Sequence, residues 1–291
     1  MGSHLIGAVV VSYNPSREIL RNVAILSGQV GHVVVVDNTP STNAQSVIDE
    51  LEQRGGCTVI RNKKNLGIAT ALNIGIRAAI SKGAVWIVTF DQDSHIGDGF
   101  IDAMLATYRE AMLHSKVGIL CPRYKDARLG VFLPMRRAAN GDISGCFTSG
   151  AMTHADTFRS MGLMEEALFI DYVDHEYCLR LRCAGYKIVE CPEAILQHSL
   201  GRITSRVLLG KTALLTNHSP RRHYYISRNR LTMIERYLFK DKEWALREIK
   251  GLLMDSVKVV LLEKQKLSKA CYILRGLFDS LFGRMGLRVS L

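Results

Sequence analysis

The sequence VTFDQDSHIG, residues 88–97, ends an apolar run at Phe90 and then places two carboxylates one residue apart, at Asp91 and Asp93. Two carboxylates at the end of a buried strand can meet one divalent cation, or a cation and a sugar hydroxyl. Mg²⁺ and Mn²⁺ prefer such oxygen ligands and can bridge to a diphosphate. The structural alternative is that Asp91 caps a turn and Asp93 caps the next helix.

Polar side chains also follow two other apolar runs. Ser12 and Tyr13 come after IGAVVVS, and Asp37 comes after VVVV. The carboxylate of Asp37 can accept hydrogen bonds from a nucleobase or a ribose, while an Asx-turn before Pro40 is an equally good interpretation.

The segment NLGIATALNIG, residues 65–75, is typical of a helix start. Asn65 and Gly67 lie where free backbone N–H groups can face a nucleotide. Gly75 lies inside the helix, where glycine costs about 1 kcal/mol relative to alanine. Its presence favours close packing against a strand over contact with a ligand. The segment is neither Gly-x-Gly-x-x-Gly nor a P-loop, which argues against dinucleotide binding and ATP hydrolysis.

A further acidic group lies in FIDYVDHEYCLRLRCAGY, residues 169–186. Asp171, Asp174 and Glu176 gather at a helix start, where the helix dipole favours negative charge. A carboxylate that faces a cleft from this position can take a proton from an acceptor hydroxyl. Helix-start electrostatics alone is the alternative interpretation.

Two basic or titratable features follow. His198, in ILQHSLGR, is a lone histidine of the kind that is more often structural than a ligand. The segment RRHYYISRNRL, residues 221–231, holds four arginines, including Arg228, that suit phosphate. Its interleaved tyrosines also resemble a nucleic-acid patch, but the preceding two thirds of the chain are not basic, so we expect no nucleic acid partner.

The elements that must position these residues alternate between strands and helices. Apolar runs predict strands at 6–12, 33–36, 57–60, 84–90 and 117–121, and helical spacing predicts helices at 16–29, 43–53, 67–81, 98–113 and 174–184. Strands that are apolar throughout indicate an α/β fold with a parallel sheet covered on both faces. Ligands sit at the carboxyl ends of such strands, so the three polar strand ends should share one edge. Residues 129–150 predict a hairpin or an irregular extension, and 223–283 are helical almost throughout.

Composition bounds the organisation of the 291-residue chain. Residues 1–200 carry a net charge of −1 and residues 201–291 a net charge of +12, which marks a boundary near residue 200 and suggests an anionic partner for the tail. Seven cysteines without a Cys-x-x-Cys pair predict reduced thiols in a cytosolic protein, without a zinc site. We see neither a secretion signal nor about 18 consecutive apolar residues, so no membrane-spanning helix is expected.

The tail has its own pattern. In LSKACYILRGLFDSLF, residues 267–282, apolar residues recur on one helix face, with lysines and arginines around it. A basic amphipathic helix predicts docking on an anionic membrane surface. Packing against the catalytic domain or a second subunit is the alternative, so a homo-oligomer is left open.

These pieces together resemble the inverting family 2 glycosyltransferases of the GT-A, Rossmann-like nucleotide-diphospho-sugar fold, and more narrowly the bacterial L-rhamnosyltransferases. The resembling segments are VVSYNP (10–15), VVDNTP (35–40), NLGIATALNIGI (65–76), FDQDS (90–94), FIDYVDHEYCLR (169–180), QHSLG (197–201), NHSPRRHYYISRNRL (217–231) and LLEKQKL (261–267). The resemblance covers nearly the whole chain from residue 5. It implies a GT-A domain over 5–200, with a nucleotide-sugar half (5–95) and an acceptor half (96–200), and a helical C-terminal region over 201–291.

The resemblance also implies roles for single residues. Ser12, Tyr13, Asp37, Asn65, Gly67 and Asp91 would hold the nucleotide sugar, and Arg228 would steady the diphosphate. Asp93 and His198 would hold Mg²⁺ or Mn²⁺, and Asp174 would be the catalytic base. The acidic residue that the family keeps before the base is Val173 here, so Asp171 or Glu176 is expected to support Asp174.

The implied activity is metal-assisted single displacement of L-rhamnose from dTDP-β-L-rhamnose onto a glycan or lipid-linked acceptor. Such an enzyme would act in polysaccharide biosynthesis, including that of lipopolysaccharide, in the cytoplasm at the inner face of the membrane. One alternative is the same fold with a UDP-hexose or UDP-galactofuranose donor. A nucleotidyltransferase is a weaker alternative, because no Gly-rich basic loop follows the first strand. A non-catalytic membrane-surface binding protein is the alternative from another class.

Overall fold

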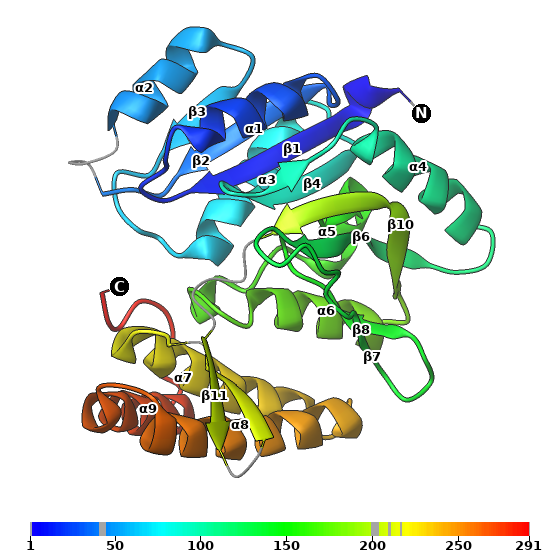
Figure 1. Cartoon of the computed structure of the whole chain (residues 1–291). Helices are drawn as coiled ribbons and strands as arrows, with labels where there is room; N and C mark the ends of the chain where they lie inside the picture. Colours follow the sequence, from blue (N-terminus) through cyan, green and yellow to red (C-terminus); the bar gives the residue numbers. More distant parts are fainter. Residues whose placement is uncertain (1, 41–44, 199–203, 209–210, 216, 291) are drawn as a thin grey trace. The chain divides into compact units, whose positions relative to one another are not determined.

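A computed structural model describes residues 2–40, 45–198, 204–208, 211–215 and 217–290. The chain divides into two compact units (Figure 1). Unit 1 comprises residues 1–165 and 173–199, and unit 2 comprises residues 166–172 and 200–291. The short segment 166–172, which the sequence placed in the acceptor half, therefore belongs to unit 2.

Unit 1 alternates strands and helices, as the apolar runs predicted. Its strands are β1 (Ile6–Ser12), β2 (His32–Asp37), β3 (Thr58–Arg61), β4 (Trp86–Asp91), β5 (His95–Ile96), β6 (Val117–Asp126), β7 (Arg136–Arg137), β8 (Ile143–Gly145), β9 (Met152–His154) and β10 (Lys187–His198). Its helices are η1 (Ser3–Leu5), α1 (Glu18–Ser27), α2 (Gln45–Arg54), α3 (Ile68–Ser81), α4 (Phe100–Ala111), α5 (Ala155–Met161) and α6 (Val173–Cys183). Antiparallel β7 and β8 form the hairpin expected within 129–150. The long strand β10 was not predicted.

The central sheet of unit 1 is mostly parallel. Its order is β3-β2-β1-β4-β9-β6-β10-β5, and the four pairs β2–β3, β1–β2, β1–β4 and β6–β10 are parallel. The short strands β9 and β5 are antiparallel to their neighbours. The mixed α/β class with a mostly parallel sheet is confirmed.

Burial explains why the strands read as unbroken apolar runs. Every residue of β1 and the four valines of β2 are buried. Both faces of these strands are therefore covered, as βα connections require. Gly75 of α3 makes this covering close, because a Cβ there would lie 2.2 Å from Val9 Cγ1. Packing against a strand, the favoured interpretation of this glycine, is confirmed.

Unit 2 is mainly helical. It contains the 3-10 helix η2 (Glu166–Leu168), the antiparallel hairpin of β11 (Thr204–Leu208) and β12 (Lys211–Leu215), and the helices α7 (Pro220–Tyr237), α8 (Lys242–Leu262) and α9 (Lys266–Leu281). Its core includes Phe169, Tyr224, Tyr225 and Val289. In the described part of the chain, no helix is both long and apolar enough to cross a bilayer.

Candidate active site

The tips of three adjacent strands bring the predicted residues of 12–91 together. In the sheet register Ser12 lies beside Asp37, and Val11 lies beside Asp91. Ser12 Oγ donates to Asp37 Oδ1 at 3.0 Å, and the hydroxyl of Thr39 donates to the same oxygen at 2.7 Å. The Asp37 side chain is thereby fixed at the end of β2. The polar strand ends share one edge of the sheet, as expected.

Gln92, between the two aspartates, joins β4 to the loop after β1. Its Oε1 accepts from the Tyr13 backbone N–H at 2.8 Å, and its Nε2 donates to the Tyr13 carbonyl at 3.2 Å. Asn22 Nδ2 in turn donates to the Gln92 carbonyl at 2.9 Å. The Tyr13 backbone is held in place while 40% of the residue stays exposed, which suits a ring that stacks on a planar ligand. No role was predicted for Gln92, because a glutamine in a turn carries no signal of its partner.

The two aspartates of the motif differ in setting. Asp91 is half-buried, and its backbone N–H donates to Ser149 Oγ at 3.3 Å. Ser149 is fully buried and shares a 2.6 Å hydrogen bond with the hydroxyl of Ser94. Asp93 is exposed on the turn that follows β4. The motif is therefore anchored by its backbone and its serine, and one carboxylate faces solvent.

The sheet register carries His198 toward the same turn. Gln197 of β10 lies opposite His95 of β5 in an antiparallel pair, so the next residue, His198, continues toward Ser94. The backbone of His198 thus lies near the aspartate motif, while its side chain lies outside the described residues.

The donor set fits a hard cation that is completed by its substrate. Among the described side chains, no three His, Cys, Asp or Glu residues form a ready-made metal cluster. Mg²⁺ commonly binds through one or two carboxylates, several waters and substrate phosphates, so a complete protein cage is not required. Asp91 and Asp93 offer oxygen ligands at the edge where the nucleotide would enter.

Asn38, the residue after Asp37, builds the loop that precedes α3. Its Nδ2 donates to Asn65 Oδ1 at 3.0 Å and to the Gly67 carbonyl at 3.2 Å, and its Oδ1 accepts from the Leu66 N–H at 3.0 Å. Gly67 has φ +84°, a left-handed conformation that favours glycine. Asn65 and Gly67 are therefore positioned relative to the tip of β2, as the nucleotide role requires. The sequence did not identify Asn38 as the residue that holds this loop.

Asp174 lies in the first turn of α6, where its Oδ1 accepts from the next backbone N–H at 2.8 Å. It lines a cavity of about 10 Å³, enough for one water at most, together with Thr89, Thr148 and other residues of unit 1. Thr148 precedes Ser149, which bonds the aspartate motif. Asp174 and the Asp91–Asp93 turn thus flank the same short segment within unit 1.

Neither acidic neighbour of Asp174 fits the expected supporting role. Glu176 is 2% exposed and pairs with Arg180 through two contacts, of 2.7 and 3.1 Å. Arg180 also donates to the carbonyl of Met161, so Glu176 acts in packing. Asp171 belongs to unit 2, where Arg222 forms an ion pair with it at 3.0 Å. Both carboxylates are engaged in structural ion pairs.

Arg228 also departs from its expected role. It is 0% exposed, and its guanidinium donates to the carbonyls of Gly286 at 2.6 Å and Leu168 at 2.9 Å. Burial lowers the pKa of the Arg228 guanidinium, and the group lies 4.9 Å from the centroid of the Tyr225 ring. Contact with a diphosphate does not fit this geometry. Arg228 instead holds segment 166–172 inside unit 2.

Segment 166–172 is strained and firmly held. Phe169, Asp171 and Tyr172 all have left-handed φ values, of 67°, 61° and 66°, which are costly for non-glycine residues. Asn229 Nδ2 offsets this cost by donating to the carbonyls of Leu168, Ile170 and Asp171 at 2.7–2.9 Å. The strained segment runs directly into α6 and Asp174 along the chain. Arg228 and Asn229 therefore hold this segment in place within unit 2.

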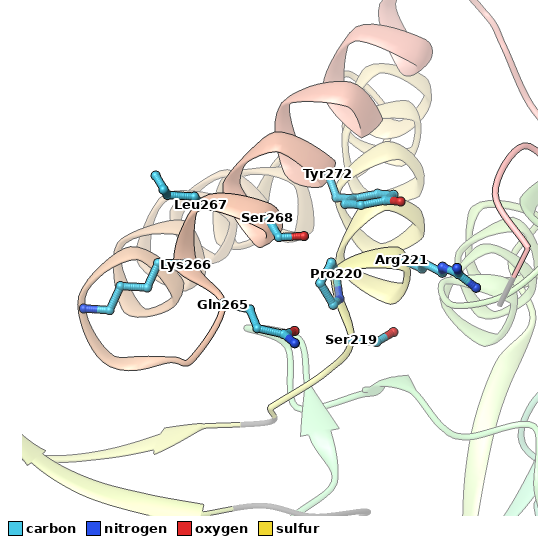
Figure 2. Close-up of a pocket in the computed structure, with 8 residues that line it drawn as sticks. All are labelled: Ser219, Pro220, Arg221, Gln265, Lys266, Leu267, Ser268 and Tyr272. Carbon is cyan, nitrogen blue, oxygen red and sulfur yellow. The ribbon is translucent and has the colours of Figure 1, made fainter.

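A hollow of about 820 Å³ lies within unit 2, between the beginnings of α7 and α9. Figure 2 shows the residues that line it, which include Pro220 and Tyr272 with their rings and Gln265 and Ser268. None of the predicted site residues lines this hollow.

The chain is similar in sequence to a glycosyltransferase family model and to known glycosyltransferases. Residues 8–134 match the family model described as glycosyl transferase family 2. The chain is 29% identical to the dTDP-rhamnosyl transferase RfbF of Shigella flexneri, over 96% of this chain and 95% of that protein. It is 26% identical to the galactofuranosyltransferase GlfT1 of Mycobacterium tuberculosis, over 77% of this chain and 80% of that protein.

Solved structures share the fold. S. aureus TarS residues 1–349 in complex with UDP superpose with a TM-score of 0.56 at 14% identity, covering 97% of this chain and 72% of that chain. The chain spans 44% of a longer TarS chain. The mannosyltransferase PcManGT of Pyrobaculum calidifontis, in complex with GDP-Man and Mn²⁺, gives a TM-score of 0.53 at 13% identity, covering 96% and 88%. The expected GT-A fold is confirmed.

Proposed function

We propose that this glycosyltransferase, whose residues 8–134 form a family 2 domain, transfers L-rhamnose from dTDP-β-L-rhamnose to a hydroxyl of a cell-surface glycan or glycolipid. The observation that carries the choice of donor is the likeness to the Shigella flexneri dTDP-rhamnosyl transferase across almost the whole of both chains. The strand-tip residues described above supply the site for the nucleotide.

In this proposal the base and ribose of the donor rest on Tyr13 and Asp37. The Ser12 hydroxyl orients Asp37, and the Asn38 network fixes Asn65 and Gly67 beside it. Asp91 then meets the ribose or the sugar at the tip of β4. A preorganised set of polar groups at the strand ends holds the donor without large rearrangement.

Asp93, with His198, would hold Mg²⁺ or Mn²⁺, which supplies positive charge for the departing diphosphate. Asp174 accepts the proton of the acceptor hydroxyl while the acceptor oxygen forms its bond to the anomeric carbon. The bond from that carbon to the diphosphate oxygen breaks, and the configuration inverts. One protein carboxylate suffices, because the diphosphate needs no proton to leave.

The acceptor is proposed to be a growing cell-surface glycan or a glycolipid, as in polysaccharide or lipopolysaccharide synthesis. The enzyme would then work at the cytoplasmic face of the membrane, held peripherally by unit 2. This location follows from the acceptor chemistry and from the basic helices of the tail.

A galactofuranosyltransferase with a UDP-galactofuranose donor is the second candidate, because GlfT1 matches over 77% of the chain. A donor screen separates the two. Nucleoside diphosphate release is measured with dTDP-β-L-rhamnose, UDP-galactofuranose and UDP-glucose in the presence of Mg²⁺ or Mn²⁺, and the glycosylated acceptor is weighed by mass spectrometry. Faster release from dTDP-β-L-rhamnose, with a mass gain of one deoxyhexose, supports the proposal, while faster release from UDP-galactofuranose overturns it.

A further inference from the structure

Helix α9 has its polarity reversed. The residues that it buries include Lys269, Asp279 and Ser280, which are 4–6% exposed. Beside Lys266 and Arg275, it exposes large apolar side chains, at 48–84%: Leu267, Leu274, Phe278, Leu281, and Phe282 just beyond its end. A surface helix ordinarily shows the opposite arrangement.

The buried face of α9 explains the reversal. Asp279 accepts from the Tyr224 hydroxyl at 2.7 Å, and Ser280 shares a 2.7 Å hydrogen bond with Thr232. A Cβ at Gly276 would lie 2.4 Å from the Tyr224 carbonyl, so α9 and α7 approach closely. Lys269 pairs with the buried Glu263. Polar contacts and small residues hold α9 on α7, and none of the described residues covers its apolar side.

The exposed apolar side is a continuous stripe. Residues 267, 271, 274, 278 and 281 follow one another at intervals of three or four, which places them on one face of the helix. We call this set, with Phe282, the α9 stripe. Helix α8 packs beside α9 and also exposes apolar side chains, at Leu246, Leu253, Met254, Val257 and Leu261 (Figure 1). Contiguous exposed apolar surface of this kind marks an interaction site.

The charges around the stripe identify the partner. Exposed cations flank it at Lys264, Lys266, Arg275, Arg284 and Arg288. Lys266 and Leu267, both exposed, are neighbours at the start of α9 (Figure 2). Between residues 264 and 290 the sequence has one acidic residue, Asp279, and it is buried. An apolar stripe with a positive border complements an anionic lipid surface, whereas a second copy would bring like charges together.

We propose that the α9 stripe and its cationic border seat unit 2 on an anionic membrane, with the helix lying in the interfacial layer. The inference rests on the proposed function, because a lipid-linked acceptor would be presented there. Sixteen residues of helix span about 24 Å, less than the ~30 Å hydrocarbon core, so α9 lies on the bilayer and does not cross it. The apolar side chains enter the acyl boundary while Arg275 and Lys266 meet the lipid phosphates.

The test is co-sedimentation of the full chain with vesicles of phosphatidylcholine containing phosphatidylglycerol, without nucleotide or acceptor. The double variant Leu274→Ser/Phe278→Ser is expected to lower the vesicle partition coefficient at least about tenfold, because two apolar side chains lose their burial. Leu113→Ser, which changes a 74% exposed leucine of unit 1, is the matched control and should bind as the unmodified chain does. Binding should also weaken on vesicles without phosphatidylglycerol and at high salt.

Two results would overturn the inference. One is unchanged vesicle binding by the double variant. The other is a lipid-free dimer, seen by light scattering, that the same variant converts to monomer, since this would assign the stripe to a second copy. Donor turnover with a soluble acceptor is measured in parallel. Loss of vesicle binding with retained turnover separates this surface from the proposed activity, and failure of the donor screen would leave the vesicle result intact.

Discussion

Replacement of the buried Arg228 tests whether this side chain holds segment 166–172 within unit 2. Replacement by methionine keeps the volume and apolar contacts of the stem and removes the guanidinium. The Gly286 carbonyl and Asn229 Oδ1 then lose the donors found at 2.6 and 2.9 Å. The Leu168 carbonyl keeps Asn229 as its donor, so it is not orphaned.

Two orphaned acceptors at about 1–3 kcal/mol each predict a loss of ~2–6 kcal/mol in the free energy of unfolding. This is a large part of the 5–15 kcal/mol that typically stabilises a domain, to order of magnitude. Urea unfolding followed by far-UV circular dichroism measures the change. Arg221→Met, an exposed arginine on the same helix that donates to the Ser290 carbonyl, is the control and should cost about 0.5 kcal/mol or less.

The same variant distinguishes positioning from ligand contact. If Arg228 holds segment 166–172, the variant loses stability while its affinity for dTDP changes little. A variant with unchanged unfolding free energy but a weaker dTDP affinity would refute the structural role and restore the diphosphate contact.

Three further outcomes follow from the described contacts. Gly75→Ala should lower the unfolding free energy by about 1–3 kcal/mol, because its Cβ would meet Val9 Cγ1 at 2.2 Å, whereas Gly97→Ala, with open space around it, should be nearly neutral in the same urea titration. Gln92→Ala should weaken dTDP binding by about five- to tenfold in calorimetry, since the Tyr13 backbone loses two hydrogen bonds, with little change in Tm; unchanged affinity would remove Gln92 from the site. Burial lowers the pKa of His218 to about 4 from its ordinary value of 6.5, so the unfolded chain binds more protons between these values and stability should fall as pH drops from about 6.5 to about 4; His218→Gln should flatten that part of the unfolding profile.

The local sequence pattern was sufficient to predict the strands and the helix that carry the proposed nucleotide-binding residues. VVVV and AVWIVTF are buried on both faces, so their unbroken apolar runs predicted parallel strands and the shared edge of Asp37 and Asp91. Gly75 inside α3 indicated a close approach of this helix to a strand, because close packing compensates the cost of a glycine within a helix. Signals of this type arise from neighbouring residues in the chain.

Hydrogen-bond partners that lie far apart along the chain could not be predicted from the sequence. Gln92 meets Tyr13 from 79 residues away, and Arg228 meets Leu168 from 60 residues away. The arginines of residues 221–231 suggested a phosphate site, but the Arg228 guanidinium donates to backbone carbonyls inside unit 2. The apolar spacing of 267–282 predicted a one-sided helix, but only the structure reveals that Lys269, Asp279 and Ser280 lie on the buried side. Which face of a helix is covered depends on the partner helix and not on the spacing.

The central claim is that Asp174, beside the strand-tip site, accepts the proton of the acceptor hydroxyl. The direct measurement is the rate of sugar transfer by Asp174→Asn, together with its dissociation constant for dTDP. We expect transfer to fall by about 10²–10⁴-fold, as loss of a general base does, while dTDP binding stays within about twofold. Transfer at the unmodified rate by a correctly folded Asp174→Asn chain would contradict the account.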